Sequence, residues 1–420
     1  MDFLLTPVGS SGDVHPYVGL GRELRTRGHQ VTVLTAEPHR GVVERAGLLF
    51  VPTFSEEQYH QATLNVDLFH PRRGFATVMK LTMSGLEPTW HALEELWEPE
   101  RTFIVGHPLG FASRSFEEKT GAAAATIHLA PSSLRSAHRV PALPPGIDVS
   151  ALPHWLKRIL WAAIDLAAID PVILPTFNRW RARHALPPIH RPFKSWINSP
   201  RRVIAMFPEW FGPRQPDWPE RFDHASFPLW DDPAGDHIDA DLESFLGSGT
   251  PPIVATPGSA NRHAAPFFAA IAEALKRLDR RGLFLTGFAE QLPKDLPDTI
   301  IARSYAPFSE VLPRSAALVH HGGIGTLAQG FAAGIPHLVM PLAFDQPDNA
   351  MRAGRLGVAR WFPPAKFTAD RVTSVLRHLL ESADVARATA ECRDRVRAVN
   401  GLALAAEVLE REAAGVRSEE

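Results

Sequence analysis

The stretch "AALVHHGGIGTLAQGFAAGIPHLVMP", residues 316–341, carries the pattern that decides the fold. A short apolar run ends in two histidines, a glycine-rich turn follows, a helical pattern opens near Thr326, and a second apolar run follows Pro336. Strand, turn, helix and strand in this order predict a βαβ unit of a parallel sheet. The free N–H groups and the positive dipole end of such a helix are suited to bind phosphate.

The same alternation of apolar runs and helical patterns occurs in two series along the chain. The first begins at "FLLTPV" (3–8) and the second at "PPIVATPGS" (251–259). Between them, 208–250 is rich in proline, which disfavours both helix and central strand. We therefore predict an α/β protein with two Rossmann-like domains facing across a cleft. The predicted segments are a first domain at 1–230, a linker at 231–250, a second domain at 251–400 and a C-terminal helix at 401–420.

Composition excludes several classes of protein. The formal net charge of −2 gives no bias toward nucleic acid, and Cys392 is the only cysteine, so no intrachain disulfide forms. The start, "MDFLLTPVGS", has an acid where a signal peptide is basic, and no apolar run reaches the ~18 residues of a membrane span. We expect a cytoplasmic protein, at the inner face of the membrane if it contacts lipid.

A Trp- and Leu-rich helical stretch at 155–196 departs from the βα rhythm and ends in a basic run at 179–194. One interpretation is a surface helix pair with a solvated basic face. The other is an amphipathic flap on the acceptor side that makes a peripheral membrane contact or touches an amphiphilic substrate.

Polar residues follow two neighbouring predicted strands of the second domain. A histidine beside the glycine turn can donate a hydrogen bond to phosphate, and Asp345 and Gln346 offer the groups that sugar hydroxyls require. Both sets stand at the carboxyl ends of parallel strands, where open α/β sheets bind ligands. The alternatives are a tight turn with a core histidine, and a cap for a helix that begins near Pro347.

The sequence resembles the family 1 glycosyltransferases of the GT-B fold. The run from "YAPF" (305–308) through "HHGGIGT" to "FDQ" (344–346) is similar to their donor-binding motif. "GSSGDVHPYVGLGRELRTRGHQVTV" (9–33) is similar to the opening of the branch with sterol and glycopeptide glycosyltransferases. Within that branch, "APSSLRSAH" (130–138) and "DWPERFDHASFPLWDD" (217–232) most resemble the rhamnosyltransferase B chain of rhamnolipid synthesis.

The resemblance implies a donor-binding role for specific residues. Tyr305 matches the aromatic residue against the nucleobase, and His320 the histidine that binds the diphosphate, whereas His321 falls at a variable position. The pair Asp345 and Gln346 matches the residues that hold the transferred sugar. The remaining phosphate contacts match Gly258, Ser259, Gly323, Gly325 and Thr326.

Two departures from the family pattern concern the donor. Ala328 stands where many UDP-sugar enzymes have a ribose-binding glutamate, which favours a deoxyribose donor such as a dTDP-sugar. Phe308 replaces the glutamine that often follows the aromatic-Ala-Pro sequence.

Asp13, at the tip of the first turn, is the expected catalytic base. Transfer to an alcohol requires removal of the hydroxyl proton, and a carboxylate within hydrogen-bond reach can accept it. The resembled branch has an aspartate at this position, whereas other members have a histidine where Ser11 stands. The alternatives are that Asp13 only caps the helix near Pro16 and that His15 is the base.

We expect no metal ion and no cofactor. The acids of "DAD" (239–241) are expected to cap the short helix that follows, and the nineteen histidines show no ligand-type spacing. A chelator should therefore leave turnover unchanged.

These features predict an inverting glycosyltransferase that moves a rhamnose- or glucose-type sugar from a dTDP- or UDP-sugar to an apolar acceptor hydroxyl. The acceptor is expected to be a hydroxy-fatty acid or other lipid, or a natural-product aglycone. A nucleotide-sugar epimerase or hydrolase of the same architecture is the alternative, and the lack of GxGxxG argues against an oxidoreductase. The expected acceptor-lining segments are the loop after 51–54, then 79–90, 130–133 and 155–185.

Overall fold

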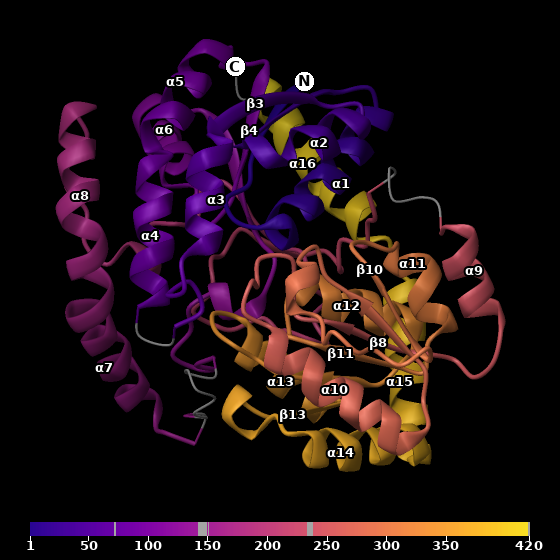
Figure 1. Ribbon diagram of the computed structural model, residues 1–420. Helices are drawn as coiled ribbons and strands as arrows, with labels where there is room; N and C mark the ends of the chain where they lie inside the picture. Colours follow the sequence, from indigo (N-terminus) through magenta and orange to yellow (C-terminus); the bar gives the residue numbers. More distant parts are fainter. Residues whose placement is uncertain (71–72, 142–148, 150, 233–237, 419–420) are drawn as a thin grey trace.

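Two parallel sheets, one in each half of the chain, form the two domains of the molecule (Figure 1). The computed structural model describes residues 1–418 except 71–72, 142–148, 150 and 233–237. The first sheet has the strand order β3-β2-β1-β4-β5-β6-β7 and the second β10-β9-β8-β11-β12-β13. The predicted fold class, two parallel-sheet α/β domains, is confirmed.

The first domain alternates strands and helices up to residue 224. Its strands are β1 (Asp2–Thr6), β2 (Gln30–Ala36), β3 (Leu49–Phe54), β4 (Thr102–Gly106), β5 (Ala123–His128), β6 (Val203–Ala205) and β7 (Phe222–His224). Its helices are α1 (Ser11–Thr26), α2 (Arg40–Arg45), α3 (Glu56–Leu64), α4 (Gly74–Ser84), α5 (Leu86–Leu96), α6 (Phe111–Thr120), α7 (His154–Ile164) and α8 (Asp170–Arg183).

The second domain repeats the alternation. Its strands are β8 (Ile253–Thr256), β9 (Gly282–Leu285), β10 (Ile300–Arg303), β11 (Ala317–His320), β12 (His337–Val339) and β13 (Ala359–Trp361). The helices after β7 are α9 (Ala240–Gly247), α10 (Ala265–Leu278), α11 (Phe308–Val311), α12 (Ile324–Ala333), α13 (Gln346–Arg355), α14 (Ala369–Glu381), α15 (Ala383–Arg397) and α16 (Gly401–Ser418).

Burial on both faces explains why the central strands are continuous apolar runs. In β1, Phe3, Leu4 and Leu5 are at most 2% exposed, because helices cover both sides of the sheet. β1 and β8 hold the same central position in their sheets. The carboxyl ends of both strands therefore open toward the space between the domains, where ligands of open α/β sheets bind.

The proline-rich stretch at 208–250 holds more regular structure than its composition indicates. It contains β7 at the edge of the first sheet, where a strand needs only one partner. It also contains α9, whose first free N–H group, that of Leu242, donates to the Asp239 carboxylate at 2.7 Å. The capping role expected for the "DAD" acids is thus confirmed for Asp239, and residues 233–237 of the expected linker lie outside the described residues.

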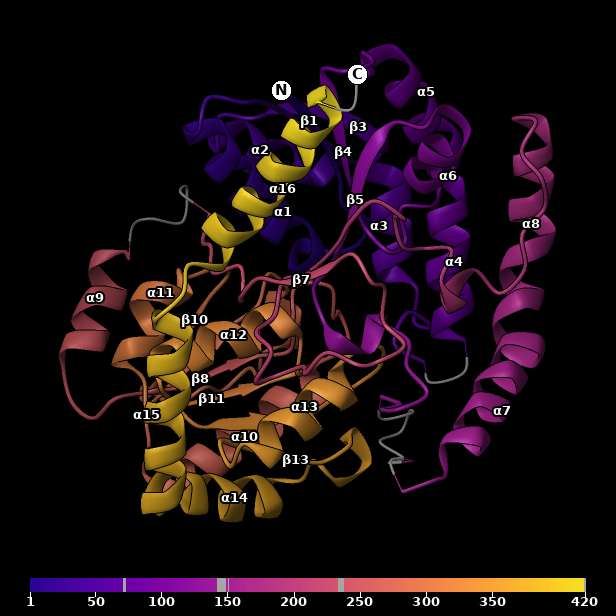
Figure 2. The same ribbon diagram turned by 180° about the vertical axis from the view of Figure 1, so that it is seen from behind.

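The C-terminal helix α16 packs on the first domain, not on the second domain that precedes it (Figure 2). Its residues Leu402, Ala405 and Leu409 lie in the same buried cluster as Leu20 and Leu24 of α1. The chain therefore crosses between the domains twice, once after β7 and once between α15 and α16. The two crossings touch, since a Cβ on Gly401 would lie 2.4 Å from the backbone oxygen of Ser226.

Removing the core contact of α16 should destabilise the first domain. Leu409 is fully buried, so Leu409→Ala is expected to lower the free energy of unfolding by about 2–5 kcal/mol. Urea unfolding followed by tryptophan fluorescence measures the change. Glu407→Ala, at an exposed position of the same helix, is the control and should change stability by less than about 0.5 kcal/mol. Equal midpoints for Leu409→Ala and the wild type would show that α16 is not part of this core.

Candidate active site

The Asp13 carboxylate is held at the carboxyl end of β1 by the turn that starts α1. Its Oδ2 accepts hydrogen bonds from the Ser10 backbone N–H at 2.8 Å and the Ser10 hydroxyl at 3.2 Å. Gly9 makes room for this carboxylate, because a Cβ there would lie 2.1 Å from Oδ2. Ser10 is the N-cap residue of α1, so Asp13 supports the cap from the first turn of the helix. Both bonds to Ser10 use Oδ2, and neither uses Oδ1.

The surroundings of Asp13 make it a stronger base than an ordinary aspartate. Burial raises the pKa of Asp13 to about 6, against a smaller opposing effect of the Ser10 hydrogen bonds. His107, which follows β4, has its Nε2 at 3.9 Å from Asp13 Oδ1. Its Nδ1 accepts the Leu109 N–H, which leaves the proton of the neutral ring on Nε2. Burial lowers the pKa of His107 to about 3, so the ring faces Asp13 as a neutral donor.

His15, the alternative base, is turned away from this arrangement. Its ring packs edge-on against Trp230 with the ring centres 5.5 Å apart. Burial lowers the pKa of His15, although the neighbouring carboxylates of Asp232 and Asp231 oppose the shift.

His320, which we expected to bind the diphosphate, is buried in the core of the second domain. It has no exposed surface, its Nδ1 accepts the Gly322 N–H at 3.1 Å, and its Nε2 lies 3.2 Å from Nδ1 of His337. Both ring nitrogens are therefore used inside the domain. The assignment of His320 as a ligand contact is wrong, because the last side chain of β11 points into the sheet's packing and not toward the turn.

His321 occupies the position that we had assigned to His320. A Cβ on Gly258 would lie 2.8 Å from its Cε1, and a Cβ on Gly323 2.5 Å from its Nε2, so the ring lies between the two glycine turns. Its Nδ1 is buried and has no hydrogen-bond partner among the described residues. Burial lowers the pKa of His321 to about 4, so the ring is neutral.

The other predicted phosphate contacts lie around the same ring. Gly258 and Ser259 follow the carboxyl end of β8, and Gly323 precedes the first residue of α12. Gly325 and Thr326 lie in the first turn of α12, whose N–H groups have no carbonyl partner within the helix. The structure thus brings Gly258, Ser259, Gly323, Gly325 and Thr326 to one place.

Asp345 and Gln346 stand where α13 begins. Gln346 is buried, and its Oε1 accepts the N–H groups of Leu342 and Ala343 at 2.8 and 3.2 Å. These donors lie in the loop before α13, and no side chain caps the first turn of that helix, so the capping alternative does not hold. Asp345 Oδ2 accepts the Asn349 amide at 2.6 Å. Burial, and after it the charge of Asp13, raise the pKa of Asp345 to about 7. The carboxylates of the two domains are therefore close enough to interact. Phe344, just before them, has a positive φ of 59°, a strained conformation typical of functional turns.

The two residues linked to the nucleoside lie further along the cleft. Tyr305 is 44% exposed and lies just after β10. Ala328, which we took as the position of the ribose-binding glutamate, packs inside a core shared with the 207–227 segment. Gln329 reaches the cleft side instead and donates to Asp231 Oδ1 at 3.1 Å. The argument for a deoxyribose donor from Ala328 is therefore withdrawn, because that side chain is buried in this core.

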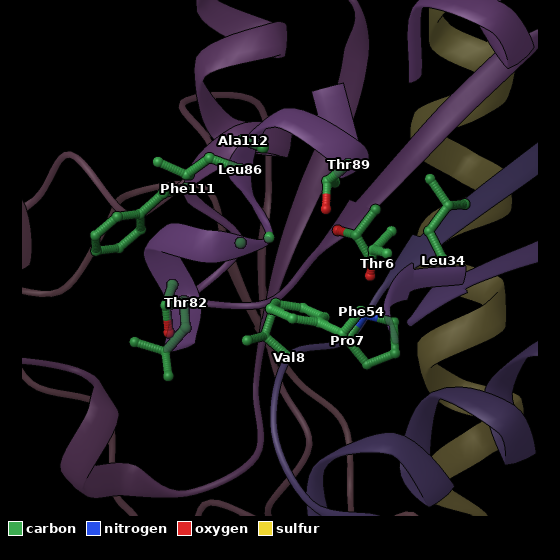
Figure 3. Close-up of a pocket in the computed structure, with 14 residues that line it drawn as sticks. Thr6, Pro7, Val8, Leu34, Phe54, Thr82, Leu86, Thr89, Phe111 and Ala112 are labelled. Atoms are coloured by element: carbon green, nitrogen blue, oxygen red, sulfur yellow. The ribbon is translucent and has the colours of Figure 1, made fainter. Parts of the chain in front are cut away.

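A narrow pocket lies on the first domain, and Pro7 and Val8, just after β1, and Leu109 and Gly110, shortly after His107, are among its lining residues (Figure 3). Figure 3 shows apolar side chains and threonine hydroxyls from β1, β3, α4, α5 and α6 pointing into it. Thr82, Leu86 and Thr89 belong to the second acceptor-lining segment predicted from sequence, whereas Thr53 and Phe54 end β3, just before the first predicted loop, which does not line the pocket. The predicted segments at 130–133 and 155–185 do not line it.

A second pocket lies between the domains and involves a cation that the sequence analysis missed. Ser259, Arg262 and Phe288 line it from the second domain, and Tyr59 and His60 from α3. The Arg262 guanidinium stacks on Phe288 at 4.2 Å and approaches His60 Nδ1 at 3.5 Å. No residue spacing connects these segments, so only the fold could place them together.

Three potential metal ligands also meet, away from the glycine turns. His138, His154 and Asp217 are exposed, and their ligand atoms lie within 4.8 Å of one another. They come from three segments far apart in the chain, so the spacing argument in the sequence could not detect them.

Comparison with known proteins agrees with this arrangement. Residues 274–405 match the model of the "Erythromycin biosynthesis protein CIII-like, C-terminal domain" family. The chain is 30% identical to an O-mycaminosyltylonolide 6-deoxyallosyltransferase of Streptomyces fradiae, over 90% of this chain and 89% of that protein.

Two solved structures show the same fold. The glycotransferase of kitacinnamycin has a TM-score of 0.75 and 22% identity, with 98% of this chain and 99% of that chain covered. A spinosyn rhamnosyltransferase complexed with thymidine diphosphate has a TM-score of 0.67 and 17% identity, with 98% and 100% covered.

The raised pKa of Asp13 has a measurable effect on stability. Because the folded pKa of about 6 exceeds the ordinary aspartate pKa of 3.8, ionisation of Asp13 destabilises the folded state as pH rises through this window. Asp13→Asn should therefore melt like the wild type near pH 3.5 and a few degrees higher above pH 7. Differential scanning calorimetry across this pH range measures it, with the exposed Asp298→Asn as control. A difference between Asp13→Asn and wild type that does not change with pH would contradict the assignment.

Proposed function

Because the chain belongs to the family 1 glycosyltransferases of the GT-B fold, we propose that it transfers a sugar with inversion, and without a metal ion, to an apolar acceptor hydroxyl. The donor is a dTDP-sugar or, second, a UDP-sugar, and the sugar is a rhamnose- or glucose-type hexose. The observation that carries the proposal is the position of Asp13 opposite Asp345, with the glycine turns and α12 beside them.

The glycine turns and α12 would bind the donor diphosphate. Unpaired N–H groups at the start of α12 and the helix dipole favour the anion. His321, with one buried ring nitrogen unpartnered, would donate a hydrogen bond to the same oxygens, and Ser259 and Arg262 would contact them from the other side. Arg262 brings the positive charge that the neutral histidine lacks.

Support for a thymidine nucleotide comes from relatives. One solved relative is a spinosyn rhamnosyltransferase with thymidine diphosphate bound, and the Streptomyces relative is named as a 6-deoxyallosyltransferase. Both names concern deoxyhexoses. Tyr305, half exposed beside the cleft, would stack on the base.

Asp13 would act as the base in a single displacement. An acceptor hydroxyl oxygen about 2.8 Å from both Asp13 Oδ1 and His107 Nε2 would donate its proton to the carboxylate and accept the His107 N–H. The oxygen forms its bond to the anomeric carbon as the bond to the phosphate oxygen breaks, and the nucleoside diphosphate leaves with the electron pair. The amides of α12 and His321 would stabilise that leaving anion.

The acceptor would enter through the pocket of Figure 3, whose apolar walls and threonine hydroxyls suit an apolar molecule with few polar groups. The macrolide relative favours a natural-product aglycone over a hydroxy-fatty acid. The comparisons do not show a special closeness to the rhamnolipid enzyme, and they give no support to an epimerase. We place the reaction in the cytoplasm, where nucleotide sugars are made.

Asp13→Asn should lower turnover by about 10²–10⁴-fold, because general-base catalysis contributes an effect of that size. Its affinity for dTDP should stay within about twofold of the wild type, since Asp13 touches only the acceptor. Release of dTDP from dTDP-sugars with a panel of hydroxylated aglycones measures turnover, and calorimetry measures affinity. Asp298→Asn is the control. Undiminished turnover of Asp13→Asn would refute the base, and turnover lost in EDTA and restored by a divalent ion would refute metal independence.

Nucleotides should identify the donor by thermal shift. A ligand present at 100 times its Kd stabilises the folded protein by about 2.7 kcal/mol. We therefore expect dTDP or UDP to raise the melting temperature and GDP to leave it unchanged. His321→Ala should raise the Kd for the nucleotide at least about tenfold, since it removes one hydrogen bond to a charged group. His378→Ala, an exposed histidine on α14, is the matched control. A larger shift with GDP, or an unchanged Kd in His321→Ala, would overturn the donor site.

A further inference from the structure

One helical rod of the first domain is far more apolar than its burial explains. α7, the π-helical segment Asp165–Ile169 and α8 run on without a break as the 30-residue rod His154–Arg183. Its most apolar window has a mean hydropathy of 1.6, and only 11% of that window is buried. Both views show the rod at the outer side of the molecule, beside α4 (Figures 1 and 2).

The face of α7 that packs on the protein is the polar one. Lys157, Trp161 and Asp165 follow one another at four-residue spacing and all bind the segment at 135–138. Lys157 donates to the His138 carbonyl at 3.2 Å, and the Trp161 indole N–H donates to the Ser136 carbonyl at 2.9 Å. Asp165, only 2% exposed, accepts from Arg135 at 2.6 Å.

The opposite face of the rod is an apolar ridge, which we define as Trp155, Ile159, Ala163 and Leu166. These residues repeat at helical spacing and extend over about 17 Å. Trp155 is 62% exposed, Ile159 55% and Leu166 73%. The usual order of an amphipathic helix, apolar inside and polar outside, is therefore reversed along α7.

The charge beside the ridge is basic. Arg158 is the exposed charged side chain within the span of the ridge, whereas Arg179 and Arg183 lie at the far end of α8, where Arg183 pairs with Glu87 at 3.8 Å. The two acids of the rod face inward: Asp165 is buried in the pair with Arg135, and Asp170 is half-buried. An apolar face that carries a tryptophan and has a basic side chain beside it suits the interface of an anionic membrane.

We propose that this ridge docks the protein on an anionic lipid surface. The ridge residues insert among the acyl chains near the headgroups, and Arg158 contacts lipid phosphates. The contacts of Lys157, Trp161 and Asp165 keep the rod on the first domain, so that it lies on the bilayer and does not cross it. A protein partner fits less well, because protein interfaces are on average no more apolar than the rest of a protein surface, whereas this ridge carries no hydrogen-bonding group except the Trp155 indole.

Vesicle flotation with the full-length protein tests the proposal. Wild type should float with vesicles of equal phosphatidylglycerol and phosphatidylcholine, and at least tenfold less with phosphatidylcholine alone or in 1 M salt. Ile159→Glu/Leu166→Glu should reduce the floated fraction at least tenfold. The matched control, Leu49→Glu/Val399→Glu, adds the same two charges at positions 53% and 42% exposed and should float like the wild type. Thermal melting of both double variants identifies any that fail to fold.

The contrary results are equally clear. Wild type that stays unbound to anionic vesicles, or a folded Ile159→Glu/Leu166→Glu protein that floats like the control, would overturn the proposal. Equal binding to phosphatidylcholine alone would overturn the role of Arg158. If wild type does not float, and sedimentation shows a dimer that becomes a monomer in Ile159→Glu/Leu166→Glu, a second copy of the chain covers the ridge. None of these results depends on the transfer reaction.

Discussion

Two carboxylates that face one poorly solvated space, Asp13 from the first domain and Asp345 from the second, set the constraint on which the rest of the site depends. Burial raises the pKa of Asp13 to about 6, and burial together with the charge of Asp13 raises the pKa of Asp345 to about 7. Near neutral pH, the two groups together therefore carry less than their full negative charge. Sugar hydroxyls that donate to Asp345 would favour its ionised form, and an acceptor hydroxyl would do the same for Asp13. Filling the cleft thus relieves the cost of bringing the domains together.

The parts of the fold that the sequence could predict are those with a strong local pattern. β1, β8 and β11 are runs buried on both faces, and α1, α10 and α12 follow them at the expected spacing. β6, β7 and β13 have three residues each, too short for any periodicity, and form only because a neighbouring strand is already in place. The packing of α16 on α1 joins residues almost 400 positions apart, and no local pattern in either helix predicts this contact.

The site was predictable in position but not in orientation. The sequence located Asp13 and the glycine turns, because both follow the carboxyl ends of central strands. The sequence analysis assigned the diphosphate contact to His320 instead of His321. Adjacent residues at the end of a strand point to opposite sides, and composition does not tell which side is the core. An error of one residue in the same direction assigned the position of the ribose-binding glutamate to Ala328 instead of Gln329. Arg262 and the cluster of His138, His154 and Asp217 were not predictable, because each depends on segments that meet only in three dimensions.

Gly401 contacts Ser226, so the two segments that cross between the domains lie side by side and form one connection, which we call the neck. A single linker would let two bodies twist as well as bend, whereas two strands of backbone pressed together resist torsion. The shared core behind them, where Phe211 and Phe227 pack on Phe331 of α12, anchors one end of the cleft. A movement of the domains would therefore be a rotation about that neck and not a twist. Such a rotation would bring Asp13 and Asp345 back to the same alignment each time the domains met.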